Sequence, residues 1–183
     1  MSIQTLMTAR EFEAVAGRLG PSELVRGEVI TLSPGGFAHS RLTARVASVL
    51  SRWADDTGLG QVLTGEMGLI VQQGPDTVRG ADVVYYSHRR LPPESSPEGF
   101  CDVAPNLVVE IVGKGQSWRE MVEKVGEYLR MGVDAVWVID PKSRRVHLYR
   151  PDTEPVVLDR NGTLADEPIL PGFACTVDDL FAR

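Results

Sequence analysis

One carboxylate interrupts an otherwise apolar, strand-like segment at residues 106–112. Apolar residues flank Glu110 on both sides, and side chains of a strand alternate between the two faces of a sheet. Glu110 therefore shares its face with Val108 and Val112. An ionised carboxylate among valines is unfavourable unless a cation or hydrogen bonds stabilise it. The segment thus predicts a partner for Glu110 elsewhere in the chain.

A second carboxylate, Asp82, immediately precedes the apolar run at residues 83–86. If the two strands are neighbours, both carboxylates reach one point in space. Carboxylates, a backbone carbonyl such as that of Ile111 and water are the ligands that Mg²⁺ or Mn²⁺ prefers. Such a metal activates bound water and neutralises charge on a phosphate, which is nuclease chemistry. The alternative is that each acid only pairs with a lysine or arginine at a strand end.

A phosphodiester-cleaving site also needs a cation near the attacking water or the phosphate, and a lysine suits this role. Lys124 lies three residues after Met121 and four before Tyr128 on a predicted helix. This spacing places Lys124 at the edge of the apolar stripe. Lys114, in a glycine-flanked segment after Glu110, is the rival candidate. The alternative for Lys124 is a side chain with an apolar stem against the protein and a solvated head.

Three further residues are candidates for supporting roles. His39 opens a long predicted helix after a loop of glycine and proline, where an imidazole can contact a phosphate or transfer a proton. It can equally be a simple helix cap. Glu28 and Glu66 lie in strand-like segments, as extra metal ligands, as orienting groups or as solvated charges. No glycine-rich phosphate-binding motif and no Ser–His–Asp order occurs in the sequence.

The elements that must position these residues alternate between helix and strand. Capping boxes at Thr8 and Ser117 predict helix starts, and apolar residues at three-to-four spacing predict a long helix over 38–55. Strands are predicted at 23–25, 28–32, 61–73, 82–86, 107–112, 135–139 and 145–149. The helix after Ser117 makes a βαβ crossover. The pattern predicts an α/β or α+β domain with a central mixed sheet flanked by helices.

Composition sets limits on the function. The 183 residues, 43% apolar and 24% charged, predict a single globular domain over the whole chain. A net charge of -6 argues against a broad nucleic-acid-binding surface but leaves room for a local basic groove. Cys101 and Cys175 make neither a disulfide framework nor a zinc site. With no secretory signal and no membrane span in the sequence, a cytoplasmic protein without a membrane partner is expected.

Several short motifs, taken together and in order, resemble one protein family. The chain resembles the Uma-two family of restriction-endonuclease-like proteins, which have the PD-(D/E)XK nuclease fold, from about residue 23 to 181. The motifs that carry the resemblance are Glu23-Leu-Val-Arg-Gly-Glu28, His39, Ala81-Asp-Val83, Ala104-Pro-Asn-Leu-Val-Val-Glu-Ile-Val112, Lys124-Val-Gly-Glu-Tyr128, Gly132-Val133, Val136-Trp-Val-Ile-Asp-Pro141 and Leu170-Pro-Gly-Phe173.

The resemblance implies roles for three residues. Asp82 and Glu110 correspond to the acidic metal ligands of the family. The related fold places a lysine two residues after the second acid, where this chain has Val112. The family instead has a lysine on the following helix, which corresponds to Lys124. Glu28 and His39 match family positions near the expected site.

Two positions depart from the family pattern. Ala81 replaces the proline that precedes the first acid, and Gly113 replaces a serine after the second. Neither change removes a proposed catalytic group, because both acids and Lys124 remain. The loss of a serine at position 113 removes any contribution that its hydroxyl would make.

The sequence therefore predicts a Mg²⁺- or Mn²⁺-dependent DNA endonuclease that hydrolyses phosphodiester bonds. Asp82 and Glu110 would hold the metal, and Lys124 would orient or activate water. One alternative is a non-catalytic module that retains the nuclease fold and binds nucleic acid or protein. Another is a metal-dependent enzyme acting on a different phosphate substrate. A homodimer is expected for an enzyme that cuts both strands of a duplex, because that reaction usually needs two sites.

Overall fold

The computed structural model describes residues 6–182. Helices and strands are mixed along the chain, as the sequence predicts. In chain order they are α1 (Ala9–Leu19), β1 (Ser22–Val25), β2 (Glu28–Thr31), α2 (Phe37–Thr57), β3 (Gly60–Gln72), β4 (Thr77–Ser87), β5 (Leu107–Ile111), α3 (Trp118–Met131), β6 (Ala135–Asp140), β7 (Arg145–Tyr149), β8 (Val156–Leu158), β9 (Thr163–Asp166), β10 (Leu170–Thr176) and α4 (Val177–Phe181).

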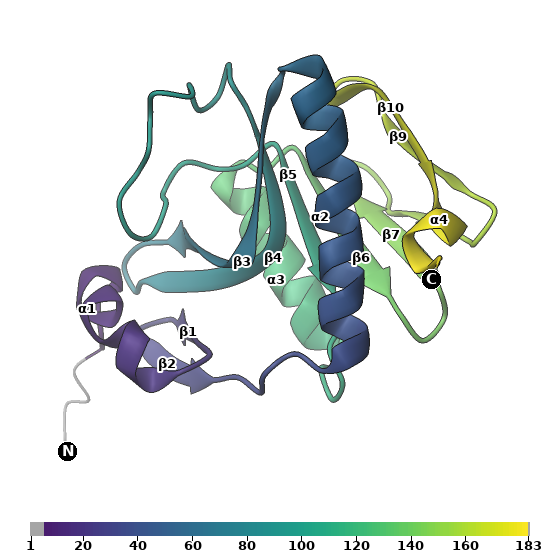
Figure 1. The fold of residues 1–183 in the computed structure, drawn as a ribbon. Coiled ribbons are helices and arrows are strands. Elements are labelled where there is room, and N and C mark those ends of the chain that lie inside the picture. The colour runs from purple at the N-terminus through teal and green to yellow at the C-terminus, as the bar shows by residue number, and fades with distance from the viewer. Residues whose placement is uncertain (1–5, 183) are drawn as a thin grey trace.

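A mixed sheet forms the centre of the molecule, with α2 across one face and α3 behind the other (Figure 1). Its strands follow the order β2-β1-β4-β5-β6-β7-β8, and β3 also pairs with β4. Only β5 and β6 run parallel among the described strand pairs, since α3 carries the chain from one to the other. The mixed central sheet flanked by helices and the βαβ crossover are confirmed, and β6 and β7 form an antiparallel hairpin.

The central strands are buried on both faces, which explains their nearly continuous apolar sequences. Val109 of β5 faces the core under α2, in the same cluster as Leu50. Val108 faces the core under α3, in the same cluster as Val125. Alternation along the strand then places Glu110 on the α3 face. The apolar environment expected for this carboxylate is confirmed.

The two capping boxes predicted from the sequence are both present. At the start of α3, Ser117 Oγ accepts a hydrogen bond from Glu120 N at 3.2 Å, and Glu120 Oε2 accepts one from Ser117 N at 2.8 Å. α3 ends at Gly132, whose φ of 104° suits a residue without a β-carbon. The apolar stripe of α3 is narrower than its sequence suggests, because Trp118 and Val122 are 41% and 43% exposed.

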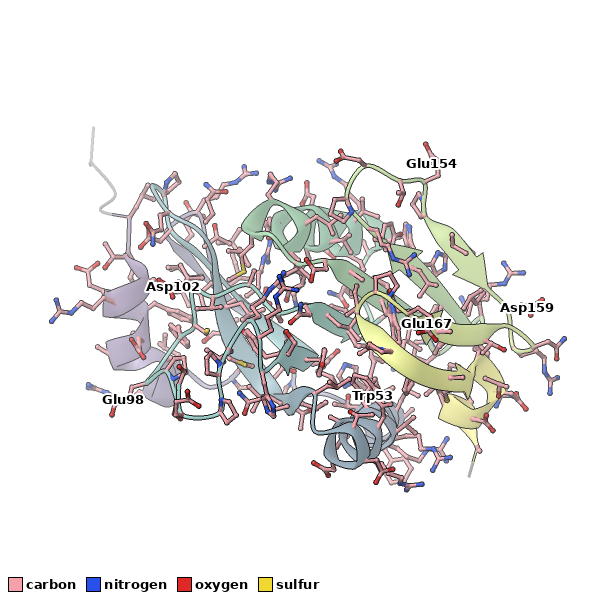
Figure 2. The ribbon with its side chains drawn as sticks, turned by 90° about the horizontal axis from the view of Figure 1, so that it is seen from above. Trp53, Glu98, Asp102, Glu154, Asp159 and Glu167 are labelled. Atoms are coloured by element: carbon pink, nitrogen blue, oxygen red, sulfur yellow. The ribbon has the colours of Figure 1, made fainter. Side chains whose placement is uncertain are left out.

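The C-terminal elements cover the sheet beside α2. Figure 2 looks onto the end of the molecule where α2 finishes and shows Trp53 next to the β9–β10 hairpin, and its indole Nε1 donates a hydrogen bond to Pro171 O at 3.1 Å. Cys101 and Cys175 are buried and unpaired in separate cores, as expected for bystander thiols. Within residues 6–182, each helix is too short or too polar to cross a membrane.

Replacing Ser117 by alanine removes the side-chain half of the α3 cap. We expect Ser117→Ala to lower the free energy of unfolding by about 1 kcal/mol. For a chain of this size that corresponds to a fall of about 2–4 °C in the melting temperature. Chemical and thermal denaturation measure both quantities. Ser96→Ala, in an exposed loop, is the control and should leave stability unchanged; equal stability of the two variants would contradict a capping role.

Candidate active site

The two acids singled out in the sequence lie on adjacent strands. β4 and β5 are antiparallel, with Val83 opposite Val109, so the next position along brings Asp82 beside Glu110. Asp82 Oδ2 accepts a hydrogen bond from the backbone N–H of Ile111 at 2.7 Å. The side chains of Asp82 and Glu110 are almost fully buried. The expected meeting of the two carboxylates in space is therefore present at the C-terminal end of β5.

Glu110 is held by two groups of α3. Its Oε1 accepts a hydrogen bond from the Tyr128 hydroxyl at 2.6 Å, and Lys124 Nζ lies 3.0 Å and 3.1 Å from its two oxygens. Burial raises the pKa of Glu110 to about 7, although the Lys124 charge opposes this rise. The nearby Asp82 charge raises the pKa of Glu110 further. Glu110 therefore holds its proton to a much higher pH than an ordinary glutamate.

Lys124 is buried, not at the edge of the apolar stripe as its spacing suggests. Its Nζ donates to Gly80 O at 2.7 Å and lies 3.0 Å from Glu23 Oε1, in addition to its contact with Glu110. Burial lowers the pKa of Lys124, but Glu110 and Glu23 more than offset this, so the net shift is upward. Lys124 is thus a permanent cation with its donors directed at three acceptors. Its rival Lys114 is exposed.

A second layer of ion pairs surrounds Lys124 and was not found by sequence reasoning. Arg79 Nη1 lies 2.8 Å from Glu23 Oε2, and Arg79 Nε lies 2.6 Å from Glu127 Oε2. Desolvation opposes the charge of Arg79, yet its hydrogen bonds to both acids raise its pKa. Glu127 follows Lys124 by three residues, which places it on the same side of α3. This spacing was the sequence signal that Glu127 lies near Lys124, whereas nothing local in the sequence links Glu23 to Arg79.

A β-bulge brings Glu66 to the same cluster. The register between β3 and β4 shifts after Thr64, so Gly65 and Glu66 lie outside the ladder, with φ of 99° and 60°. The bulge lies at Gly65 and Glu66, whereas Gly68 pairs in register with Gly80. A β-carbon on Gly80 would lie 2.8 Å from Glu66 Oε2, so glycine leaves room for the carboxylate in this position. Glu66 is exposed overall, but partial desolvation of its carboxylate and the neighbouring Asp82 charge raise its pKa.

His39 reaches the cluster from the opposite face of the sheet. It lies in the first turn of α2, and its Nε2 is 3.3 Å from Asp82 Oδ2. The hydrogen bond to Asp82 raises the pKa of His39 despite partial burial, and the Asp82 and Glu66 charges and the Ile111 carbonyl add to the rise. His39 is thus charged to a higher pH than an ordinary histidine and remains partly open to solvent.

Glu28 is not part of this cluster. It lies at the turn of the β1–β2 hairpin opposite Val25, with an exposed side chain, and no described residue forms an ion pair or hydrogen bond with its carboxylate. Glu23, at the other end of the same sequence motif, reaches Lys124 instead. The local sequence did not distinguish the two, because both glutamates are in the same hairpin and differ only in how far they lie from its turn.

The cluster offers the donor chemistry of a hard divalent cation. Carboxylates of Asp82, Glu66 and Glu110 and the carbonyl of Ile111 are oxygen donors of the kind that Mg²⁺ or Mn²⁺ prefers. No described residue donates a hydrogen bond to Asp82 Oδ1, so this oxygen is available. Both Glu110 oxygens, by contrast, contact Lys124. Accordingly, no three His, Cys, Asp or Glu side chains of residues 6–182 are arranged as a ready-made metal site.

A sheet of this order, with acids on two adjacent central strands, is the architecture of restriction-endonuclease-like nucleases. The Uma2 family, described as "Putative restriction endonuclease", matches residues 9–178 of the chain. The protein belongs to this family. The resemblance stated from the sequence motifs is therefore confirmed.

A solved structure has the same fold. It is the crystal structure of "a putative nuclease belonging to DUF820" from Anabaena variabilis ATCC 29413. The two structures superpose with a TM-score of 0.80 over 96% of this chain and 97% of the other, at 21% sequence identity. At that identity the similarity establishes the fold alone. No curated protein matches the chain.

The raised pKa of Glu110 predicts a pH dependence of stability. Between about pH 4.5 and 7 the folded protein keeps a proton on Glu110 that the unfolded chain releases, so this residue's contribution to stability falls as pH rises. We expect the stability of the wild type relative to Glu110→Gln to fall by up to about 3 kcal/mol across this window. Urea denaturation at several pH values in a chelator measures it.

Glu28→Gln, at an exposed glutamate, is the matched control for this experiment. Its stability relative to the wild type should not change with pH in the same window. A relative stability of Glu110→Gln that is flat, or that changes in the opposite direction, would show that Glu110 is an ordinary ionised carboxylate in the folded protein.

Removing the buried cation should be far more damaging than removing an exposed one. We expect Lys124→Met to lower the free energy of unfolding by about 3–5 kcal/mol, because Glu110 and Glu23 lose their shared buried cation and must stay unpaired or take up a proton. Adding Glu110→Gln should restore part of this loss, since Glu23 keeps Arg79 as a partner. Lys114→Met is the control, with an effect below about 0.5 kcal/mol. Additive effects of the Lys124 and Glu110 substitutions would contradict a direct pairing.

Proposed function

We propose that the protein is a metal-dependent endonuclease that hydrolyses phosphodiester bonds of DNA. The observation that carries the proposal is the convergence of Asp82, Glu110 and Lys124 at one end of the sheet, with Lys124 3.0 Å from Glu110. Membership of the Uma2 family supports the same reaction class. Mg²⁺ or Mn²⁺ is the cofactor that the oxygen donors favour.

Each residue of the cluster has a defined task in this proposal. Asp82, Glu110 and the carbonyl of Ile111 would hold the cation, and Glu66 would be an additional ligand. A divalent ion bound there supplies an activated water and a counter-charge for the phosphate. Asp82 keeps one free oxygen for this purpose, while the Ile111 N–H fixes the other. The buried setting strengthens every charge–charge interaction relative to water.

His39 is suited to transfer a proton or to bind a phosphate oxygen at the solvent-exposed side of the site. Its ring contacts Asp82 on one side and is partly exposed on the other. The raised pKa of His39 keeps it cationic to a higher pH than an ordinary histidine, and in that form it presents positive charge to an approaching phosphate. Lys124 fixes the orientation of Glu110 and balances its charge.

One observation favours a second candidate function, a non-catalytic nucleic-acid-binding module. The three donors of Lys124 are matched by Gly80 O, Glu23 and Glu110, so the ammonium has no donor left for water or phosphate. In a catalytic site a lysine in this role contacts the reacting groups. The two functions are separated by whether DNA is cleaved, since both predict binding.

Cleavage of supercoiled plasmid in Mg²⁺ or Mn²⁺ tests the proposed nuclease. We expect nicked or linear product with the wild type, abolished by a chelator and reduced at least about 100-fold by Asp82→Asn, which removes a charge without changing shape. Asp55→Asn, at an exposed acid of α2, is the control and should cleave normally. Wild-type binding without cleavage, or full activity of Asp82→Asn, would overturn the nuclease in favour of the binding module.

Two further measurements complete this test. Single-stranded DNA, RNA and nucleotides as alternative substrates distinguish a DNA endonuclease from an enzyme acting on another phosphate compound. Light scattering of the protein in solution measures whether it is the homodimer that we propose for double-strand cutting.

A further inference from the structure

α2 carries positive charge only, up to its last turn. Between Phe37 and Trp53 the helix has three arginines, at positions 41, 45 and 52, and no acidic residue. Arg41 and Arg45 are exposed and lie four residues apart, hence on one side of the helix. The helix dipole favours cations only in the last turn, so it does not account for Arg41 and Arg45.

The β6–β7 turn places a further arginine, Arg144, beside Arg41 and Arg45 of α2. Arg144 lies in this turn with φ of 55°, a conformation that asparagine or glycine adopts at lower cost. A cavity of about 270 Å³ separates the turn from α2, and Arg41, Arg45 and Arg144 all line it. Arg144 is exposed and lies over the ring of Phe181, 5.1 Å from its centroid. We refer to Arg41, Arg45 and Arg144 as the arginine surface.

The acids nearest to the arginine surface are engaged elsewhere. Asp179 accepts hydrogen bonds from Thr176 Oγ1 at 2.6 Å and Thr176 N at 3.2 Å, and Asp140 binds Ser143 Oγ at 2.6 Å. Arg45 Nε donates to the backbone carbonyl of Asp179, not to its carboxylate. The Asp179 charge partly offsets Arg45, whereas no described carboxylate lies within ion-pair distance of Arg41 or Arg144.

The arginine surface lies at the same end of the sheet as the acidic cluster. β5 and β6 are parallel, with Ile111 opposite Ile139, so the turn after β6 emerges beside the end of Glu110's strand. The first turn of α2 carries both His39, which contacts Asp82, and Ala38, which lines the arginine cavity. Figure 1 shows the start of α2 and the end of β6 at one end of the molecule.

The opposite end of the molecule carries charges of both signs. α2 finishes there with Asp55 and Asp56, and the exposed Arg89 lies at the same end. Figure 2, which looks onto this end, shows Glu98 and Asp102 on the long loop after β4 and Glu167 at the β9–β10 turn. The arginine surface, by contrast, is a local positive region in a chain of net charge -6. Such a region attracts a polyanion to that part of a protein.

We propose that the arginine surface binds the sugar–phosphate backbone of DNA beside the cleavage site. It would contact phosphates away from the one held at the acidic cluster, and α2 would lie between the two contacts. Arginine is suited to this because its planar guanidinium binds phosphate through two hydrogen bonds. The inference rests on the proposed nuclease function for its choice of DNA, but binding tests it independently of cleavage.

The experiment compares two doubly substituted proteins by fluorescence anisotropy with a short labelled DNA duplex in a chelator. Arg41→Ala with Arg144→Ala removes two arginines of the surface but leaves Arg45 bonded to Asp179. Arg89→Ala with Arg130→Ala is matched in charge at exposed positions; Arg130 lies in the last turn of α3 and Arg89 follows the end of β4, both away from the acidic cluster. Melting temperatures of both proteins establish that they fold.

We expect the Arg41/Arg144 variant to bind about 10-fold more weakly than the wild type at about 0.1 M salt. Its plot of log affinity against log salt should be shallower by about one to two units, because each lost phosphate contact removes about 0.9. The control variant should match the wild-type slope. Equal slopes for the two variants, or wild-type binding that does not depend on salt, would overturn the inference.

The same proteins separate this inference from the proposed function. Wild type that binds through Arg41 and Arg144 but does not cut plasmid would refute the nuclease and leave the arginine surface supported. Wild type that cuts plasmid, with both variants binding DNA alike, would leave the nuclease supported and refute the arginine surface.

Discussion

The buried ammonium of Lys124 is the interaction on which the rest of the site depends. It joins α3 to β5 through Glu110, to β1 through Glu23 and to the backbone of β4 through Gly80. A buried ion pair contributes little net stability relative to a well-packed apolar pair, but losing one partner leaves a costly unpaired charge. Its main effect here is therefore geometric. It fixes the position of the Glu110 carboxylate and the packing of α3 against the sheet.

The charges around Lys124 do not balance. Five carboxylates, from Glu23, Glu66, Asp82, Glu110 and Glu127, surround two permanent cations, Lys124 and Arg79. The imbalance is concentrated around Asp82, whose charge raises the pKa of both Glu66 and Glu110. Protonation of His39 and Glu110 compensates part of this excess negative charge. A divalent cation would compensate it better, since it would favour the ionised form of every nearby carboxylate.

The fold and the central pair of acids were predictable because both depend on local patterns. Apolar runs identified the central strands, and a charge within one such run identified Glu110. Lys124 was found by its helical spacing, but its burial was not, because spacing alone does not show that Trp118 and Val122 are exposed while Lys124 is buried. Glu23 and Arg79 are 56 residues apart in the chain, so their pairing follows from the order of β1 and β4 in the sheet. Tyr128 read as an apolar residue because sequence periodicity does not reveal the direction of a hydroxyl.

The acidic cluster and the arginine surface also constrain each other. Without a bound cation, the cluster has an excess of negative charge and repels a phosphate. A guanidinium close to Asp82 would pair with it and occupy the proposed metal position, so arginines there could not assist the proposed reaction. The arginine surface is instead separate from the cluster but at the same end of the sheet. In the proposed nuclease, the arginine surface would attract DNA and a bound cation would neutralise charge at the bond to be cut, which is how a protein of net negative charge would act on DNA.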